Sequence, residues 1–197
     1  GVSGAGPITH FDASKFKTQF ACEVKGFKAN EHLDRKEARK MDLYTQYAIV
    51  AAKEAIEDSA MDLEKVDKTR IGVIYGVGIG GLNTLEEELF NYALTKDKIG
   101  PKFNPFFIPK MIADIASGHI SIMYGFHGPN FTTTSACASS SNAIADAFNY
   151  IRLGKANVIV AGGAEAAICP GGVGGFNAMH ALSTRNDDPT RASRPFS

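Results

Sequence analysis

The sequence contains no tryptophan and only three cysteines in its 197 residues. These three, Cys22, Cys137 and Cys169, are odd in number and lack the paired spacing of a disulfide scaffold. Such cysteine usage is typical of a reducing compartment, so we expect a cytoplasmic protein. No group of cysteine and histidine residues has the spacing of a zinc site, and we therefore expect no bound metal.

Neither sign of charge is in excess, and long apolar runs are missing. Lys plus Arg and Asp plus Glu each number 21, which argues against a general nucleic-acid binder. No apolar run reaches the length of a membrane-spanning helix and no signal peptide is recognisable, so we expect no membrane association. With 44% hydrophobic residues, the chain is long and apolar enough to fold around a real core.

Both ends of the chain have the composition of loops. The sequence begins with Gly1 in the segment GVSGAGPIT, and residues 1–30 show no regular periodicity. It stops in the polar segment RASRPFS, without a closing helix or strand. We therefore expect this chain to be one part of a longer protein.

The stretch 131–153, FTTTSACASSSNAIADAFNYIRL, carries the most informative chemistry. Its β-branched start at 131–134 favours a strand, and apolar residues at helical spacing follow from Ala143 onward. Cys137 lies at the junction between strand and helix. Four candidate helix caps come directly after it: Ser139, Ser140, Ser141 and Asn142.

Two interpretations of Cys137 follow from this position. The start of a helix presents unpaired N–H groups and the positive end of the helix dipole, which favour the nucleophilic thiolate. The same N–H groups stabilise an oxyanion if the thiolate attacks a carbonyl. Alternatively, Cys137 is a buried structural residue, because free cysteine is among the most buried residue types.

The order of the remaining elements predicts an α/β fold. Continuous apolar strands are expected at 70–75 and 157–161, and helices at 34–59, 83–94 and 112–124. Alternation of strand and helix indicates right-handed crossovers and a mainly parallel sheet with helices on both faces. In such sheets functional groups gather at the carboxyl ends of the strands, where Cys137 is placed.

Glycine-rich segments follow both apolar strands. GVGIGG after the first strand lacks the spacing of a dinucleotide or phosphate-binding loop, so close backbone approach beside an active site is the favoured interpretation. Glu165 follows the second strand and is expected to be buried and hydrogen-bonded to backbone, not catalytic. GGVGG at 171–175 is expected to be a flexible loop. His119, inside the helix at 112–124, is expected to be a hydrogen-bonded core residue and not a base.

Two further segments suggest contact with a partner. The segment 98–109 holds three prolines and three phenylalanines, and we expect it to be buried against a partner or around an apolar ligand. Four basic residues open the helix at 34–59. They form either a solvated helix face or a dock for an acidic partner. These four residues are Arg35, Lys36, Arg39 and Lys40.

Several motifs then make the chain resemble a known family. TTSACASS, VIVAGGAE, GVGGF, ALSTRNDDP and ASRPF occur in this order, together with GVGIGG, NPFFIP and SGHISIMYGFHGP. The chain resembles the condensing enzymes of fatty-acid synthesis, in particular the β-ketoacyl-[acyl-carrier-protein] synthase II family. This resemblance implies the thiolase fold, a layered αβαβα architecture. It also implies that residues 1–197 form the N-terminal half, without the first strand and without the whole C-terminal half.

The resemblance implies a role for each matching residue. Cys137 matches the acyl-accepting nucleophile, Ile79 and Phe107 match residues that line or close the acyl pocket, and Phe176 matches the aromatic residue that gates the cysteine. His180 departs from the family, whose members generally have arginine at this position. The basic region matches the carrier-protein dock, which the resemblance extends to five residues: Arg35, Lys36, Arg39, Lys40 and Lys102. No cofactor is implied.

The implied reaction is acyl transfer to the cysteine, followed by decarboxylative condensation with malonyl-[acyl-carrier protein]. The implied partners are acyl carrier protein and a second copy of the chain, paired across the strand at 131–134. The family's catalytic histidines and lysine lie in motifs such as NAHGTST and KSMTGH, which are not found in this sequence. We therefore expect this piece alone to be inactive. A polyketide-type ketosynthase and a non-catalytic fragment that only dimerises or binds carrier protein remain the alternatives.

Overall fold

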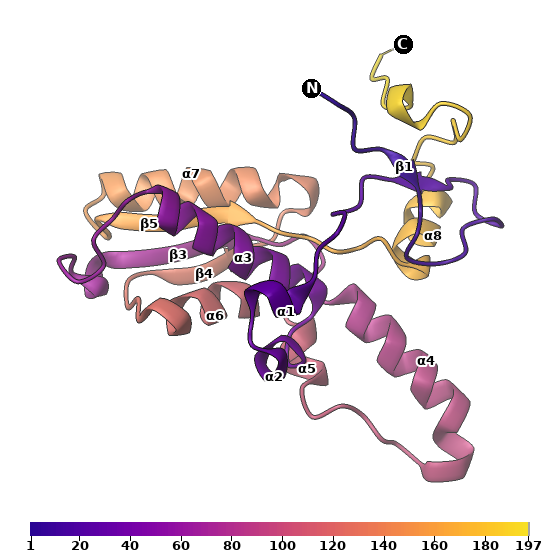
Figure 1. Ribbon diagram of the computed structural model, residues 1–197, viewed down its shortest axis with the longest axis horizontal. Coiled ribbons are helices and arrows are strands. Elements are labelled where there is room, and N and C mark those ends of the chain that lie inside the picture. Colours follow the sequence, from indigo (N-terminus) through magenta and orange to yellow (C-terminus); the bar gives the residue numbers. More distant parts are fainter. Residues whose placement is uncertain (197) are drawn as a thin grey trace. The chain divides into compact units, whose positions relative to one another are not determined.

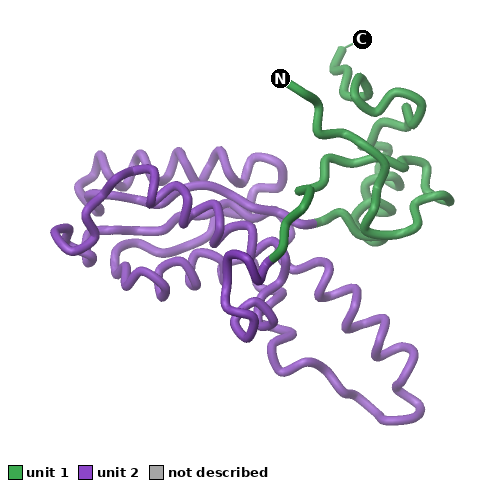
Figure 2. The backbone as a smooth tube through the Cα atoms, viewed as in Figure 1, with its two compact units in different colours: residues 1–28, 167–197 green, residues 29–166 purple. Residues whose placement is uncertain are grey.

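The computed structural model describes residues 1–196 and divides the chain into two compact units (Figure 2). Residues 29–166 form one unit, and residues 1–28 form the other together with the stretch from residue 167 onward. Each unit has its own cluster of buried apolar side chains. In the described part of the chain, no helix is both long and apolar enough to cross a membrane.

The unit of residues 29–166 is built on a three-stranded parallel sheet (Figure 1). Its strands are β3 (Ile71–Gly76), β4 (Asn130–Thr133) and β5 (Val158–Gly163), in the order β4-β3-β5. β3 is buried along its whole length, as expected for a central strand, because it pairs with a neighbour on each side. The predicted parallel sheet is confirmed.

Helices cover both faces of this sheet, as predicted (Figure 1). α7 (Ser139–Arg152) packs on one face, and α3 (Leu43–Asp58) and α6 (Ile115–Tyr124) pack on the other. The side chains of β3 alternate between the two sides. Ile71, Val73 and Tyr75 join the core beneath α3 and α6, whereas Ile74 packs with the alanines of α7.

The prediction of a single helix at 34–59 is wrong, because this segment forms two separate helices. α2 (Arg35–Ala38) begins after Asp34, and α3 begins only at Leu43. Asp42 is the N-cap residue of α3: its buried carboxylate accepts hydrogen bonds from the Tyr44 N–H at 3.2 Å and from the Thr84 hydroxyl at 2.6 Å. A short helix α1 (Ala29–His32) precedes α2.

The segment 98–109, which holds three prolines and three phenylalanines, is partly helical. α4 (Leu82–Ile99) is longer than the helix predicted at 83–94, and Gly100 ends it with a φ of 67°. A short helix, α5 (Phe107–Met111), follows the aromatic residues. The helix predicted at 112–124 begins later, because α6 starts at Ile115.

The two ends of the chain build the other unit. It contains the paired strands β1 (Gly6–Pro7) and β2 (Phe20–Ala21), the helix α8 (Pro170–Ala178) and a short 3-10 turn at Pro189–Arg191. The expected flexible loop at 171–175 is wrong, because these residues lie inside α8. Pro170 opens this helix, and Val173 is buried against Ile8 and Ala13. Packing against the N-terminal segment therefore overrides the flexibility of the glycines.

Candidate active site

Cys137 is exposed on a 3-10 turn, Ala136–Ala138, which joins the end of β4 to the start of α7. The predicted position between strand and helix is confirmed, and burial as a structural residue is excluded within this chain. The predicted capping is wrong: Ala138 holds the N-cap position of α7, without a side-chain cap bond. The turn therefore separates the cysteine from the first residue of α7.

Side chains around the turn hold it in a strained shape. Ala136, directly before the cysteine, has a φ of 50°, in the left-handed region that residues other than glycine rarely adopt. The Ser139 hydroxyl donates to the Ala136 carbonyl at 2.7 Å and accepts from the Ser135 N–H at 3.0 Å. The Asn142 amide donates to the Ser135 hydroxyl at 2.6 Å. Two of the residues expected as helix caps, Ser139 and Asn142, thus stabilise the turn instead.

The end of the central strand lies directly beneath this turn. A Cβ atom at Gly76 would clash with the backbone of Ser139 and Ser140, so only glycine allows β3 and the start of α7 to approach so closely. The Thr133 hydroxyl also donates to the Ser139 carbonyl at 2.8 Å. Cys137 is therefore fixed at the carboxyl end of the sheet, where functional groups were predicted.

The glycine-rich loop after β3 lies beside the cysteine turn and is held by Glu165. The Glu165 carboxylate accepts backbone hydrogen bonds from Gly78 at 3.0 Å, Ile79 at 2.8 Å and Gly80 at 3.2 Å. A Cβ atom at Gly78 would lie 3.4 Å from the Ala136 carbonyl oxygen. The predicted close backbone approach and backbone-bonded carboxylate are confirmed, but Glu165 is exposed and not buried as expected.

The far side of the same loop packs on α5. The Gly81 N–H donates to the Met111 carbonyl at 3.1 Å, and Gly80 has a φ of 89°. Phe107 opens α5, and its ring stacks on that of Phe103 with 5.5 Å between centroids. The loop that carries Ile79 thus contacts both the cysteine turn and the helix that carries Phe107.

Two residues singled out in the sequence lie in the other unit. Phe176 is a partly buried residue of α8. His180 follows α8, is exposed, and has a φ of 56°. The role of Phe176 as the aromatic residue that gates the cysteine stays a prediction.

The five basic residues do not form one uniform helix face. Arg35 and Lys36 lie on α2, and Lys102 lies between α4 and α5; all three are exposed. Arg39 is also exposed and follows α2 in the break before α3. Lys40 differs, because its Nζ lies 2.6 Å from a Glu37 carboxylate oxygen and 5.9 Å from the centroid of the Phe106 ring.

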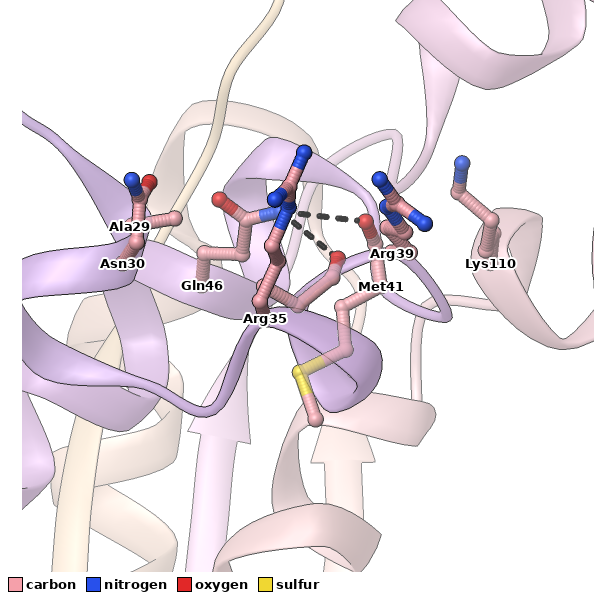
Figure 3. Close-up of a pocket in the computed structure, with 8 residues that line it drawn as sticks. Ala29, Asn30, Arg35, Arg39, Met41, Gln46 and Lys110 are labelled. Carbon is pink, nitrogen blue, oxygen red and sulfur yellow. Dashed lines mark hydrogen bonds between the residues drawn. The ribbon is translucent and has the colours of Figure 1, made fainter.

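Residues 35–40 form a basic segment, and a hollow of about 440 Å³ opens beside it (Figure 3). Arg35 and Arg39 line it from the segment before α3, and Lys110 lines it from α5. Sequence reasoning did not select Lys110, because it stands alone in its segment and no spacing connects it to the earlier arginines. Only the packing of α5 brings these three cations together.

His119 lies in the middle of α6, as predicted, but is partly buried and not a full core residue. Burial lowers the pKa of its imidazole below the ordinary value of 6.5. The charges of Glu37 and Lys40 also act on this pKa, in opposite directions. His119 therefore belongs to the surroundings of the basic segment.

Fold and site together define a class: an α/β protein with an exposed cysteine on a strained turn at the carboxyl end of a parallel sheet. The chain belongs to the β-ketoacyl synthase family, because the family model described as "Beta-ketoacyl synthase, N-terminal domain" matches residues 1–197. The resemblance noted in the sequence is thereby confirmed.

Curated relatives carry a more specific name. A 3-oxoacyl-[acyl-carrier-protein] synthase 2 of Synechocystis sp. is 47% identical over 196 residues, an alignment that covers 100% of this chain and 46% of the relative. Proteins of the same name from Vibrio cholerae and Staphylococcus aureus are each 44% identical, again over 100% of this chain and over 47% and 48% of their own lengths. The chain thus spans about half the length of the curated relatives that it matches.

Solved structures agree with the predicted thiolase-like fold. A β-ketoacyl synthase from Burkholderia phymatum superposes with a TM-score of 0.84 at 28% identity, covering 100% of this chain and 48% of that chain. A ketosynthase assembly whose title describes a type II polyketide acyl-carrier protein in complex with its ketosynthase gives a TM-score of 0.72 at 25% identity, over 79% of this chain and 44% of that chain. This chain therefore has the fold of the N-terminal half of a ketosynthase.

Proposed function

We propose that the protein containing this chain is a 3-oxoacyl-[acyl-carrier-protein] synthase of fatty-acid elongation, with Cys137 as its acyl-accepting nucleophile. One observation carries the proposal: Cys137 is exposed on a strained turn that four hydrogen-bonding neighbours and a glycine contact hold at the end of the central strand. A reactive side chain needs both access and a fixed position, and this turn supplies both.

The proposed first step is acyl transfer. The Cys137 thiolate attacks the thioester carbonyl of an acyl-[acyl-carrier protein], the C–S bond to the carrier breaks, and the carrier leaves as a thiolate. A malonyl-carrier thioester then loses carbon dioxide, and the resulting carbanion attacks the acyl group on Cys137. The new carbon–carbon bond extends the chain by two carbons, and the cysteine thiolate is released.

Chain residues near the cysteine are proposed to receive the acyl group. Ile79 is 44% exposed on the loop beside the turn, and Phe107 lies on the helix that packs against this loop. For Phe176, the resemblance to the family supports a different role, that of the aromatic residue that gates the cysteine. The groups for malonyl decarboxylation belong to family motifs that are not found in this sequence, so the proposal for this step concerns the whole protein.

An acidic acyl carrier protein is the proposed partner of the basic segment and of Lys102. Arg35, Lys36, Arg39 and Lys102 are exposed and available to acidic side chains. Lys40 already has a carboxylate partner in Glu37, so its contribution to docking should be smaller. A structural neighbour described as a ketosynthase in complex with an acyl-carrier protein supports this class of partner.

A homodimer is the proposed assembly. β4 is an edge strand of the sheet and pairs only with β3 among the described strands. An edge strand presents unpaired backbone groups, which a second copy of the same strand can satisfy.

Fatty-acid substrates are favoured over polyketides because the relatives at 44% to 47% identity carry the 3-oxoacyl synthase name.

Acyl transfer can be tested on the full-length protein. After incubation with an acyl-[acyl-carrier protein], mass spectrometry should find the acyl group on the peptide that contains Cys137. Cys137→Ala should abolish the acylation. Cys22→Ala is the matched control, because Cys22 is also exposed and should not be needed. Acylation that persists in Cys137→Ala, or that is found on Cys22, would refute the proposal.

A further inference from the structure

The hollow beside α2 collects positive charge from two distant parts of the sequence (Figure 3). Arg35 and Arg39 come from the segment before α3, and Lys110 comes from α5. The eight described residues that line the hollow include these three cations and no acidic residue. Its surroundings therefore favour an anion.

The walls of the hollow are held in place before any ligand arrives. The Gln46 side-chain amide donates to the Ala38 carbonyl at 3.0 Å and to the Met41 carbonyl at 3.2 Å, which fixes the turn that carries Arg39 (Figure 3). On the other side, the Tyr44 hydroxyl donates to the Ile112 carbonyl at 2.5 Å, directly after α5. The backbone positions of Arg39 and Lys110 are thus set by contacts that do not involve their charges.

The three cations differ from their neighbour Lys40. Lys40 has Glu37 as a carboxylate partner, whereas no ion pair involves Arg35, Arg39 or Lys110 among the described residues. Like charges around one hollow repel each other until an anion enters. Arginine also binds carboxylates through two parallel hydrogen bonds, which gives the hollow a preference for planar anions.

We propose that Lys110 completes an anion-binding hollow with Arg35 and Arg39, and that a carboxylate side chain of an acidic carrier protein occupies it. This inference rests on the proposed function, because it assigns a further docking residue to the same surface. The hollow is open to solvent, and the exposed Lys36 follows Arg35 directly on α2. An anion presented by a protein surface fits this setting, because an exposed cation beside the hollow then meets another acidic side chain of the same partner.

The first measurement is the affinity of the full-length protein for an acidic acyl carrier protein at low and physiological salt. Lys110→Ala should weaken binding about two- to fivefold, and Lys110→Glu about tenfold, since exposed ion pairs are worth little individually and charge reversal adds repulsion. Both variants should also reduce the salt dependence of the affinity. Lys155→Glu is the matched control, because Lys155 is exposed in the turn between α7 and β5. It should leave the affinity unchanged.

A double-mutant cycle tests whether Lys110 and Arg39 share one anion. If they do, Arg39→Ala and Lys110→Ala combined should weaken binding by less than the product of the two single effects. A strictly multiplicative effect would overturn the shared hollow. If Arg39→Glu weakens binding and Lys110→Glu does not, the inference fails while the proposed dock stands. If neither weakens binding, the dock itself is wrong.

Discussion

The backbone N–H of Ile79 donates a 2.8 Å hydrogen bond to the carboxylate of Glu165, which follows the end of β5. The same carboxylate also accepts from Gly78 and Gly80, so one side chain fixes three consecutive residues of the loop. This loop lies against the turn of Cys137, and Ile79 is a proposed residue of the acyl site. A residue after the last strand thus shapes the surroundings of a cysteine on a different element.

Replacement of this carboxylate should loosen the loop. Glu165→Gln removes the charge and leaves one acceptor oxygen for three donors, so we expect a loss of about 1 kcal/mol in the free energy of unfolding, at the low end for charged hydrogen bonds because the site is exposed. Hydrogen exchange of the Gly78, Ile79 and Gly80 amides should become faster. Glu54→Gln, an exposed change on α3, is the control. Unchanged exchange at the three amides would contradict the role given to Glu165.

The close approach beneath the cysteine turn predicts opposite effects for two glycine substitutions. Gly76→Ala should destabilise the protein by more than about 2 kcal/mol, because its Cβ would meet the backbone of Ser139 and Ser140, which has no room to move. Gly118→Ala on α6 meets no atom within 4 Å and should stabilise the helix by about 0.5–1 kcal/mol. Urea unfolding of both variants provides the comparison. Equal effects at the two sites would show that the strand and α7 do not touch as described.

His119 predicts a loss of stability in mild acid. Its pKa is lowered in the folded protein, so below the ordinary value of 6.5 the unfolded chain takes up a proton that the folded chain resists. The contribution of neutral His119 to the free energy of unfolding is therefore fully present above pH 6.5. It is lost as the pH falls through the lowered pKa of the folded protein. Urea unfolding between pH 7.5 and 5.0 should show a smaller decline for His119→Gln than for the parent. His127→Gln, at an exposed histidine, is the matched control.

Assembly provides the last prediction. Phe106 and Ile108 are 40% and 53% exposed around Phe107, and a dimer that joins two copies of β4 would bury such apolar side chains. An obligate interface of this type covers on the order of 2,000 Å² or more. Sedimentation equilibrium of the full-length protein at micromolar concentration should give the mass of a dimer, and Phe107→Ala should weaken it. A monomer mass for the parent protein would exclude this assembly.

Local periodicity and composition were enough to predict the parallel sheet, the burial of β3 and the position of Cys137, whereas β5, expected to be buried as well, is an edge strand and partly exposed. These features follow from short-range rules: a continuous apolar run predicts a buried strand, and a glycine after it predicts close approach. The motifs around Cys137 were also enough to identify the family. Neither prediction depends on contacts between residues that are distant in the sequence.

Tertiary packing decided the rest, because the deciding contacts join residues far apart in the sequence. Asp42, which caps the start of α3, is buried with its carboxylate hydrogen-bonded to Thr84, a residue distant in the sequence. The glycines of α8 become helical because Val173 is buried against the N-terminal segment. Glu165 holds the loop of Ile79, and Lys110 joins the two arginines, only after the strands and α5 have packed. A sequence pattern reports the preference of its own segment, whereas these positions depend on the neighbours that the fold supplies.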